Sequence, residues 1–125
     1  MTIAFWCVFV AGVLPYAATL IAKSGRRNFD NRDPRAWLAQ QEGFRKRANA
    51  AQLNSFEAFP FFAAAVIIAH ITKGQVPLVD TLALLFVGAR VLYLALYLAN
   101  LASLRSLVWF VGLGLAVAIL IVAAI

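Results

Sequence analysis

Four long apolar stretches, separated by short polar breaks, make up most of this chain. They cover residues 2–22, 50–72, 76–100 and 104–125. Each reaches the roughly 20 residues that a helix needs to cross a hydrocarbon layer about 30 Å thick. The pattern therefore predicts four membrane-spanning helices and one substantial loop, residues 23–49.

The lengths of the connections predict how these helices are arranged. Residues 73–75 and the few residues before Arg105 leave room only for tight turns. Because helices joined by tight turns run antiparallel, we expect an all-α protein, a single membrane domain of residues 1–125 folded as an antiparallel four-helix bundle. Pro15 falls within the first span, where a membrane helix tolerates a kink, and it is assigned no chemistry.

Composition supports this membrane assignment. Hydrophobic residues make up 64% of the 125 residues, against about half in a soluble domain. The single cysteine, Cys7, excludes an intrachain disulfide and a cysteine-based metal site, and no metal site is predicted. Cys7 and His70 are interpreted as packing or interfacial residues, as is Trp109.

The positive charge predicts an orientation rather than a nucleic-acid partner. The net charge is +6, but eight of the eleven basic residues lie between Lys23 and Arg47, in the one long loop. Basic loops stay in the cytoplasm, so we expect this loop and Arg105 to be cytoplasmic and both termini to lie on the other side of a cell inner membrane. Four of these loop residues are expected to set topology and contact lipid headgroups: Arg26, Arg27, Arg32 and Arg35.

Polar side chains recur at helical spacing inside the second and third spans, where they are costly. One face of the second span carries Arg47, Ala50, Asn54, Glu57 and Phe61, and one face of the third carries Phe86, Arg90, Tyr93, Tyr97 and Asn100. At about 1.5 Å per residue, Glu57 lies roughly 10 Å from the cytoplasmic end and Arg90 roughly 15 Å. The two stripes lie at similar depth, which predicts a shared polar cleft with Arg90 as the partner of Glu57.

A structural alternative stays open from the residues alone. Glu57 and Arg90 would then form a buried ion pair that specifies helix register and binds nothing. The number of further polar groups at this depth favours a binding cleft, since convergent polar side chains in a cavity are typical of ligand sites.

The complete motif is Arg47-x6-Asn54-x2-Glu57-x2-Pro60, followed by Arg90-x2-Tyr93-x3-Tyr97 and then Leu104-Arg105-Ser106-Leu107. Its order and spacing resemble the MAPEG family of membrane proteins in eicosanoid and glutathione metabolism, most closely the bacterial branch. The resemblance covers essentially the whole chain. It implies a homotrimer in the lipid bilayer, with glutathione bound as co-substrate between adjacent subunits near the cytoplasmic end of the second and third spans.

The resemblance also implies roles for individual residues. Arg105 would stabilise the glutathione thiolate as the catalytic residue, and Glu57 would meet the amino group of the peptide. Ala50 stands where the leukotriene-forming and related synthases carry an arginine, so Arg47 or Arg45 would take over the contact with a carboxylate. The residues implied to bind glutathione are Arg47, Asn54, Glu57, Arg90, Tyr93 and Tyr97.

Two functions follow from these expectations. The first is a membrane glutathione-dependent transferase or peroxidase that acts on a lipophilic small molecule entering from the bilayer. The alternative is a non-catalytic MAPEG-like scaffold or lipid-binding protein that keeps the fold. A transporter is disfavoured, because the charge bias is strong and the polar cleft reaches only about halfway across.

Overall fold

The computed structural model describes residues 1–25 and 28–125 and consists there of five helices without strands. Arg26 and Arg27, which the sequence assigns to the basic loop, lie outside the described residues. The helices are α1 (Ile3–Lys23), α2 (Pro34–Ala39), α3 (Gly43–Lys73), α4 (Pro77–Leu98) and α5 (Ala102–Ala124). Four of them, all but α2, are long and apolar enough to cross a membrane, as the sequence predicts.

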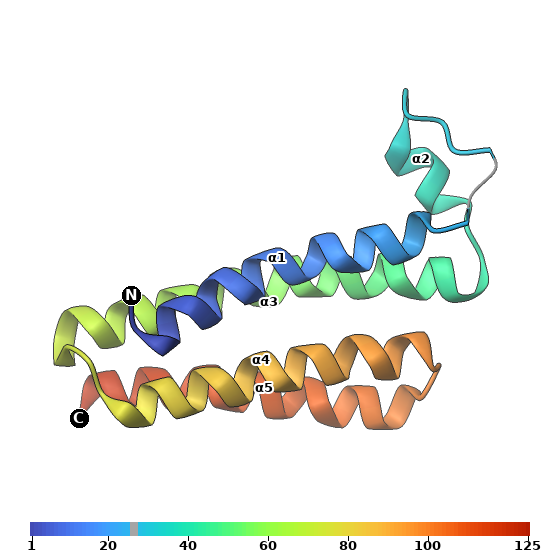
Figure 1. The fold of residues 1–125 in the computed structure, drawn as a ribbon. Coiled ribbons are helices and arrows are strands. Elements are labelled where there is room, and N and C mark those ends of the chain that lie inside the picture. Colours follow the sequence, from blue (N-terminus) through green and yellow to red (C-terminus); the bar gives the residue numbers. More distant parts are fainter. Residues whose placement is uncertain (26–27) are drawn as a thin grey trace.

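The four long helices lie roughly along one axis in two layers, α1 with α3 and α4 with α5 (Figure 1). Both termini lie at one end of this bundle, and α2 lies at the other end (Figure 1). The antiparallel four-helix arrangement therefore agrees with the prediction from the connection lengths.

The predicted loop 23–49 was wrong in two respects. Asp33 caps a short helix, α2, by accepting a hydrogen bond from the backbone N–H of Ala36 at 3.1 Å. The third helix also starts at Gly43, seven residues before the apolar stretch at residue 50. Its 31 residues span about 46 Å, more than the hydrocarbon layer, so its first turns extend beyond the apolar region. Hydrophobicity shows only which part of a helix lies in lipid. Outside the lipid, basic residues and alanine continue the helix because they are good helix formers, so the hydrophobic pattern does not show where the helix starts.

Small side chains allow the helices to approach closely. The core between the layers contains many alanines, for example Ala4, Ala65 and Ala116, together with Cys7, which is buried as expected. Such residues are typical of helix contacts in membranes, where close packing replaces the hydrophobic effect. Larger groups fill the middle of the bundle, where the rings of Phe62 and Phe86 stack with centroids 3.9 Å apart.

Polar contacts fasten the first helix at the end that carries the termini. The buried carboxylate of Asp80 accepts a hydrogen bond from the backbone N–H of Ala4 at 2.8 Å, and Thr2 caps the same helix. His70 donates to the carbonyl of Val66 through Nδ1, so its Nε2 accepts from the Thr2 hydroxyl at 2.9 Å. Asp80 and Thr2 thus satisfy the N–H groups of Ala4 and Phe5 at the start of α1, and His70 holds the Thr2 hydroxyl, which assigns Asp80 and His70 to structure.

Candidate functional site

Arg90 is the centre of the polar cluster inside the bundle. It lies on α4, is only 4% exposed, and reaches across to α3. Its Nη2 donates hydrogen bonds to Asn54 Oδ1 at 2.9 Å and to Ser55 Oγ at 3.2 Å. The guanidinium also lies over the ring of Tyr93, 4.3 Å from its centroid. The structure thus brings Asn54, Arg90 and Tyr93 together, as their matching depth suggests.

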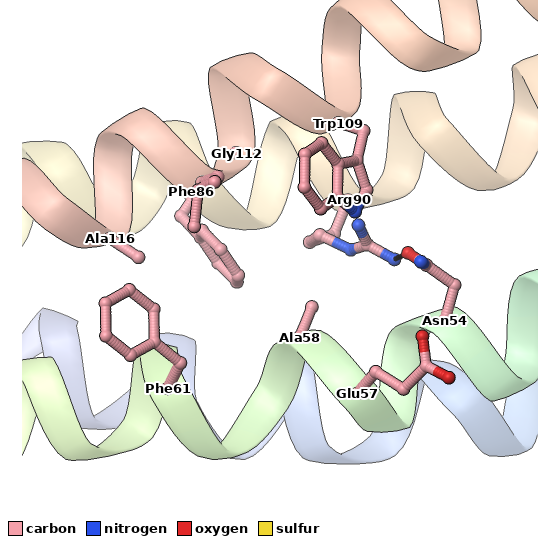
Figure 2. A pocket seen from close by; sticks show the side chains of 10 residues that line it. Asn54, Glu57, Ala58, Phe61, Phe86, Arg90, Trp109, Gly112 and Ala116 are labelled. Atoms are coloured by element: carbon pink, nitrogen blue, oxygen red, sulfur yellow. Dashed lines mark hydrogen bonds between the residues drawn. The ribbon is translucent and has the colours of Figure 1, made fainter.

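A cavity of about 210 Å³ adjoins this cluster between α3, α4 and α5. Figure 2 shows Asn54, Glu57 and Arg90 at one end of it and aromatic or small side chains towards the other. Glu57 is exposed, and with Arg90 it lines the same cavity, so the expected shared cleft is present.

The expected pairing of Glu57 with Arg90 was wrong. Among the described residues the only ion pair joins Lys46 to Glu42 on the surface. Arg90 uses its hydrogen bonds for Asn54 and Ser55, which precede Glu57 on α3. Equal depth on two helices does not decide which of several neighbouring polar groups the long Arg90 side chain reaches. Here its acceptors are the Asn54 amide oxygen and the Ser55 hydroxyl.

A second hollow of about 170 Å³ lies between the ends of α4 and α5. Arg105, in the first turn of α5, lines it together with Tyr93. The Arg105 guanidinium lies over the ring of Tyr97 at 4.2 Å, and the rings of Tyr93 and Tyr97 meet edge to face at 5.7 Å. Trp109 borders both hollows and therefore separates them.

The turn after α4 positions Arg105. Asn100 adopts a left-handed conformation with φ of 60°. Its N–H donates to the carbonyl of Tyr97, and the next N–H, from Leu101, donates to the carbonyl of Leu96. This pair of bonds is the Schellman arrangement that ends a helix. Asn100 is exposed in this turn. It therefore ends α4 and does not form a wall of the cleft, although the sequence pattern places it on the polar stripe.

The cations expected to replace an arginine at position 50 bind backbone carbonyls. Arg47 Nε donates to the carbonyl of Leu98 at 3.2 Å, at the end of α4. Arg45 donates to the carbonyl of Ser24 through Nε and Nη2, at 3.2 and 2.8 Å. Neither cation lines the two hollows, whereas the other predicted site residues lie in or beside them.

Sequence reasoning missed part of the fifth helix. Trp109, Gly112 and Ala116 all line the larger cavity, and they follow Arg105 at intervals of four, three and four residues. This spacing marks one helical face and is the signal that would have found them. Ser55 was also missed, because a serine beside a strong polar motif is unremarkable in sequence.

The site combines fixed charges with an open apolar cavity. The Arg105 cation faces an aromatic ring, the Arg90 cation is held by neutral oxygens, and the Glu57 carboxylate stands at an exposed rim. Such a set suits a small molecule that carries both signs of charge. No group of three or more histidine, cysteine, aspartate or glutamate side chains with metal-binding geometry occurs in the described part of the chain.

Comparison with known proteins gives one match. The model of the MAPEG family matches residues 3–125, nearly the full length. Neither the curated proteins nor the solved structures give a match. The family includes glutathione transferases and peroxidases as well as non-catalytic members. With four helices able to cross a membrane, a polar cluster within them and a family match over almost every residue, this multi-pass membrane protein belongs to the MAPEG family.

Proposed function

We propose that this protein is a glutathione-dependent transferase or peroxidase of the bacterial branch that acts on a lipophilic electrophile. The observation that carries the proposal is the environment of Arg105. Its guanidinium lines an open hollow and packs on Tyr97, and no carboxylate of the described chain pairs with it. A cation without a carboxylate partner keeps its charge available for an anion such as a thiolate.

The chemistry requires the thiolate form of glutathione. A free thiol has a pKa of about 8.5, so little thiolate exists at neutral pH unless a nearby cation stabilises it. In this proposal Arg105 supplies that charge. In a transferase the sulfur bonds to an electrophilic carbon while either a leaving group departs with its bonding electrons or a double bond opens and takes up a proton. In a peroxidase the sulfur attacks a peroxide oxygen, the O–O bond breaks to release an alcohol after protonation, and a second glutathione converts the resulting sulfenic acid to the disulfide and water. Holding both reactants in adjacent hollows supplies the remaining rate enhancement.

The other polar residues hold the peptide in this proposal. Glu57 is exposed and forms no ion pair within the described chain, so its carboxylate is available to the glutathione amino group. Asn54 and Arg90 form one wall, while Tyr93 and Tyr97 orient the thiol end. Arg47 lines neither hollow; in this proposal it meets a glutathione carboxylate from beside the end of α4, where its Nε donates to the carbonyl of Leu98.

An exposed carboxylate on a membrane-spanning helix is also an argument for assembly. A charge facing lipid is costly, and a neighbouring subunit lowers that cost by covering it. We therefore propose a homotrimer in the cell inner membrane, with glutathione bound between adjacent subunits, both termini on the non-cytoplasmic side and the α2 end in the cytoplasm.

The second candidate is a non-catalytic scaffold or lipid-binding protein. The bonds from Arg90 to Asn54 and Ser55 favour it, because they tie α4 to α3 without any ligand. In that case the cluster specifies helix register and the hollows contain only lipid or water.

Titration of glutathione into the purified protein distinguishes the two candidates. The proposal predicts a saturable thiolate absorbance in the ultraviolet and a higher melting temperature. Arg105→Ala is expected to abolish the absorbance, whereas Arg32→Ala, which removes an exposed loop cation, leaves it unchanged. If millimolar glutathione changes neither signal, the enzyme proposal is wrong and the scaffold is favoured. If Arg105→Ala dissociates the assembly, the role of Arg105 is structural.

A further inference from the structure

The turn between α4 and α5 lies at the end of the bundle that carries α2 (Figure 1). Only residues 99–101 connect the two helices there. Arg105 follows in the first turn of α5, where its N–H donates to the carbonyl of Leu101 at 3.0 Å. Because so few torsion angles separate the end of α4 from Arg105, the place of this arginine depends on how firmly the end of α4 is held.

The carbonyl groups at the end of α4 all have hydrogen-bond donors. A helix leaves its last four carbonyls without partners inside the helix, and in a membrane protein an unpaired carbonyl is costly. Backbone N–H groups of residues 99–101 satisfy three of them, the carbonyls of Ala95, Leu96 and Tyr97. The carbonyl of Leu98 is the fourth, and its donor comes from another helix.

Arg47, on α3, supplies that donor. Its Nε donates to the Leu98 carbonyl at 3.2 Å, and a cation at the C-terminus of a helix also interacts favourably with the helix dipole. The side chain of Leu98 packs against two apolar clusters, one that contains Trp37 and one that contains Leu94. The acceptor is therefore held in place as well, and the contact links α3 to the end of α4.

The early start of α3 brings two arginines to the ends of other helices. Arg45 lies two residues before Arg47 and binds the carbonyl of Ser24, at the end of α1, through Nε and Nη2. Residues two apart on a helix point roughly 200° apart, so α3 reaches α1 on one side and α4 on the other. Both arginines precede the apolar stretch that begins at residue 50. The part of α3 beyond the apolar region thus fastens two helix ends.

We propose that Arg47 is a positioning residue, which holds the last carbonyl of α4 and thereby fixes the turn that places Arg105 over Tyr97. The consequence for catalysis rests on the proposed function, in which Arg105 stabilises a thiolate. The fixing of the turn does not, because its contacts lie within the described chain and need no ligand. The contact uses Nε, so Arg47 can hold the turn and still present its Nη groups to a carboxylate.

Hydrogen–deuterium exchange without glutathione tests whether Arg47 fixes the turn. Arg47→Gln removes the donor, and Arg45→Gln is the matched control, because it removes the same charge near the start of α3. We expect the N–H groups of residues 99–105 to exchange about tenfold faster in Arg47→Gln, since one charge-assisted hydrogen bond is lost. Arg45→Gln is expected to speed exchange at the end of α1 and not in this turn.

The side chain of Arg105 gives a second readout without glutathione. Its guanidinium lies 4.2 Å from the centroid of the Tyr97 ring, so the ring current shifts its Nε–H resonance upfield in an NMR spectrum. We expect this resonance to move towards that of a free arginine in Arg47→Gln and to stay in place in Arg45→Gln. Arg47→Lys keeps the charge but loses the planar guanidinium. It should show the same changes at smaller size, and it replaces Arg47→Gln if that variant does not fold.

The absorbance of bound glutathione thiolate tests whether Arg47 acts through Arg105. At saturating glutathione, Arg47→Gln is expected to raise the pKa of the bound thiol towards the free value of about 8.5. The same substitution in the Arg105→Ala background is expected to have no further effect, because Arg47 then has no cation to position. A residue that only stabilises the fold, or only binds a carboxylate, would not show this dependence.

Three results would overturn the proposal. Equal exchange of the turn in Arg47→Gln and in the parent would mean that the turn holds itself. Faster exchange with an unmoved Arg105 resonance would mean that the packing of α5 places Arg105. Additive effects of Arg47→Gln and Arg105→Ala on the thiol pKa would mean that Arg47 acts on glutathione directly. A parent protein without any thiolate signal contradicts the proposed function alone, and the exchange and the resonance then decide whether Arg47 positions Arg105.

Discussion

Replacing Arg90 tests how the membrane interior tolerates a buried cation. The side chain is 4% exposed and donates to Asn54 at 2.9 Å and Ser55 at 3.2 Å. Arg90→Met keeps much of the volume and removes the charge and both bonds. It is therefore the substitution that isolates the polar contacts from packing.

The expected magnitude follows from opposing terms. Each hydrogen bond from a charged donor contributes about 1.5–3 kcal/mol, and the contact with Tyr93 about 1–2 kcal/mol. Against this, removing a buried charge recovers several kcal/mol of desolvation cost. What remains is the cost of orphaned partners, about 1–3 kcal/mol for Asn54 and less for Ser55, whose hydroxyl can turn to a carbonyl one turn back. We expect a net destabilisation of about 2 kcal/mol.

Reversible unfolding in mixed micelles of detergent and denaturing surfactant measures this free energy. Adding Asn54→Leu to Arg90→Met is expected to recover about 1–2 kcal/mol, because no amide oxygen is then left without a donor. Arg90→Ala should be worse than Arg90→Met, since it also leaves a cavity. The reasoning is refuted if Arg90→Met unfolds at the same surfactant fraction as the parent, or if the double variant shows no recovery.

Three further predictions concern other contacts. Glu57→Gln is expected to weaken glutathione binding about 10–100-fold in calorimetric titration, because a charge-assisted hydrogen bond to the ligand is lost. The free energy of unfolding should stay the same, because no ion pair within the described chain is broken. Unchanged affinity would remove Glu57 from the site. Asp80→Asn should destabilise the fold by about 1–2 kcal/mol without altering glutathione affinity, since it weakens the hydrogen bond to the Ala4 N–H. A variant as stable as the parent would contradict the capping role assigned to Asp80. Asn100→Val should destabilise the fold by about 1–2 kcal/mol and Asn100→Gly should not, because φ is 60° at this position and a branched side chain is strained there. An equal effect of both substitutions would argue against backbone strain as the cause.

Much of the fold could be predicted because membrane thickness constrains it. The apolar runs had to be about 20 residues long, and the tight connections required antiparallel neighbours. The contact between Asn54 and Arg90 could also be predicted, since helical periodicity and depth in the membrane can both be read from the sequence. These quantities depend only on counting residues along regular helices.

The remaining features depend on contacts that counting does not reveal. The acceptors of Arg90, the cavity beside Trp109 and the capping of α1 by Asp80 all depend on which rotamers pack together. Asp80 is buried and accepts from the backbone of another helix, a contact that its place near a turn in the sequence does not reveal. The early start of α3 was missed because hydrophobicity reports lipid contact and not helix length.

The central claim is that Arg105 favours the thiolate of bound glutathione. The most direct test is to record the thiolate absorbance of glutathione bound to the protein across a range of pH. We expect the pKa of the bound thiol to lie clearly below the free value of about 8.5, and to return towards that value in Arg105→Ala while glutathione still binds. A bound thiol whose pKa equals the free value, or is lowered equally in both proteins, would contradict the claim.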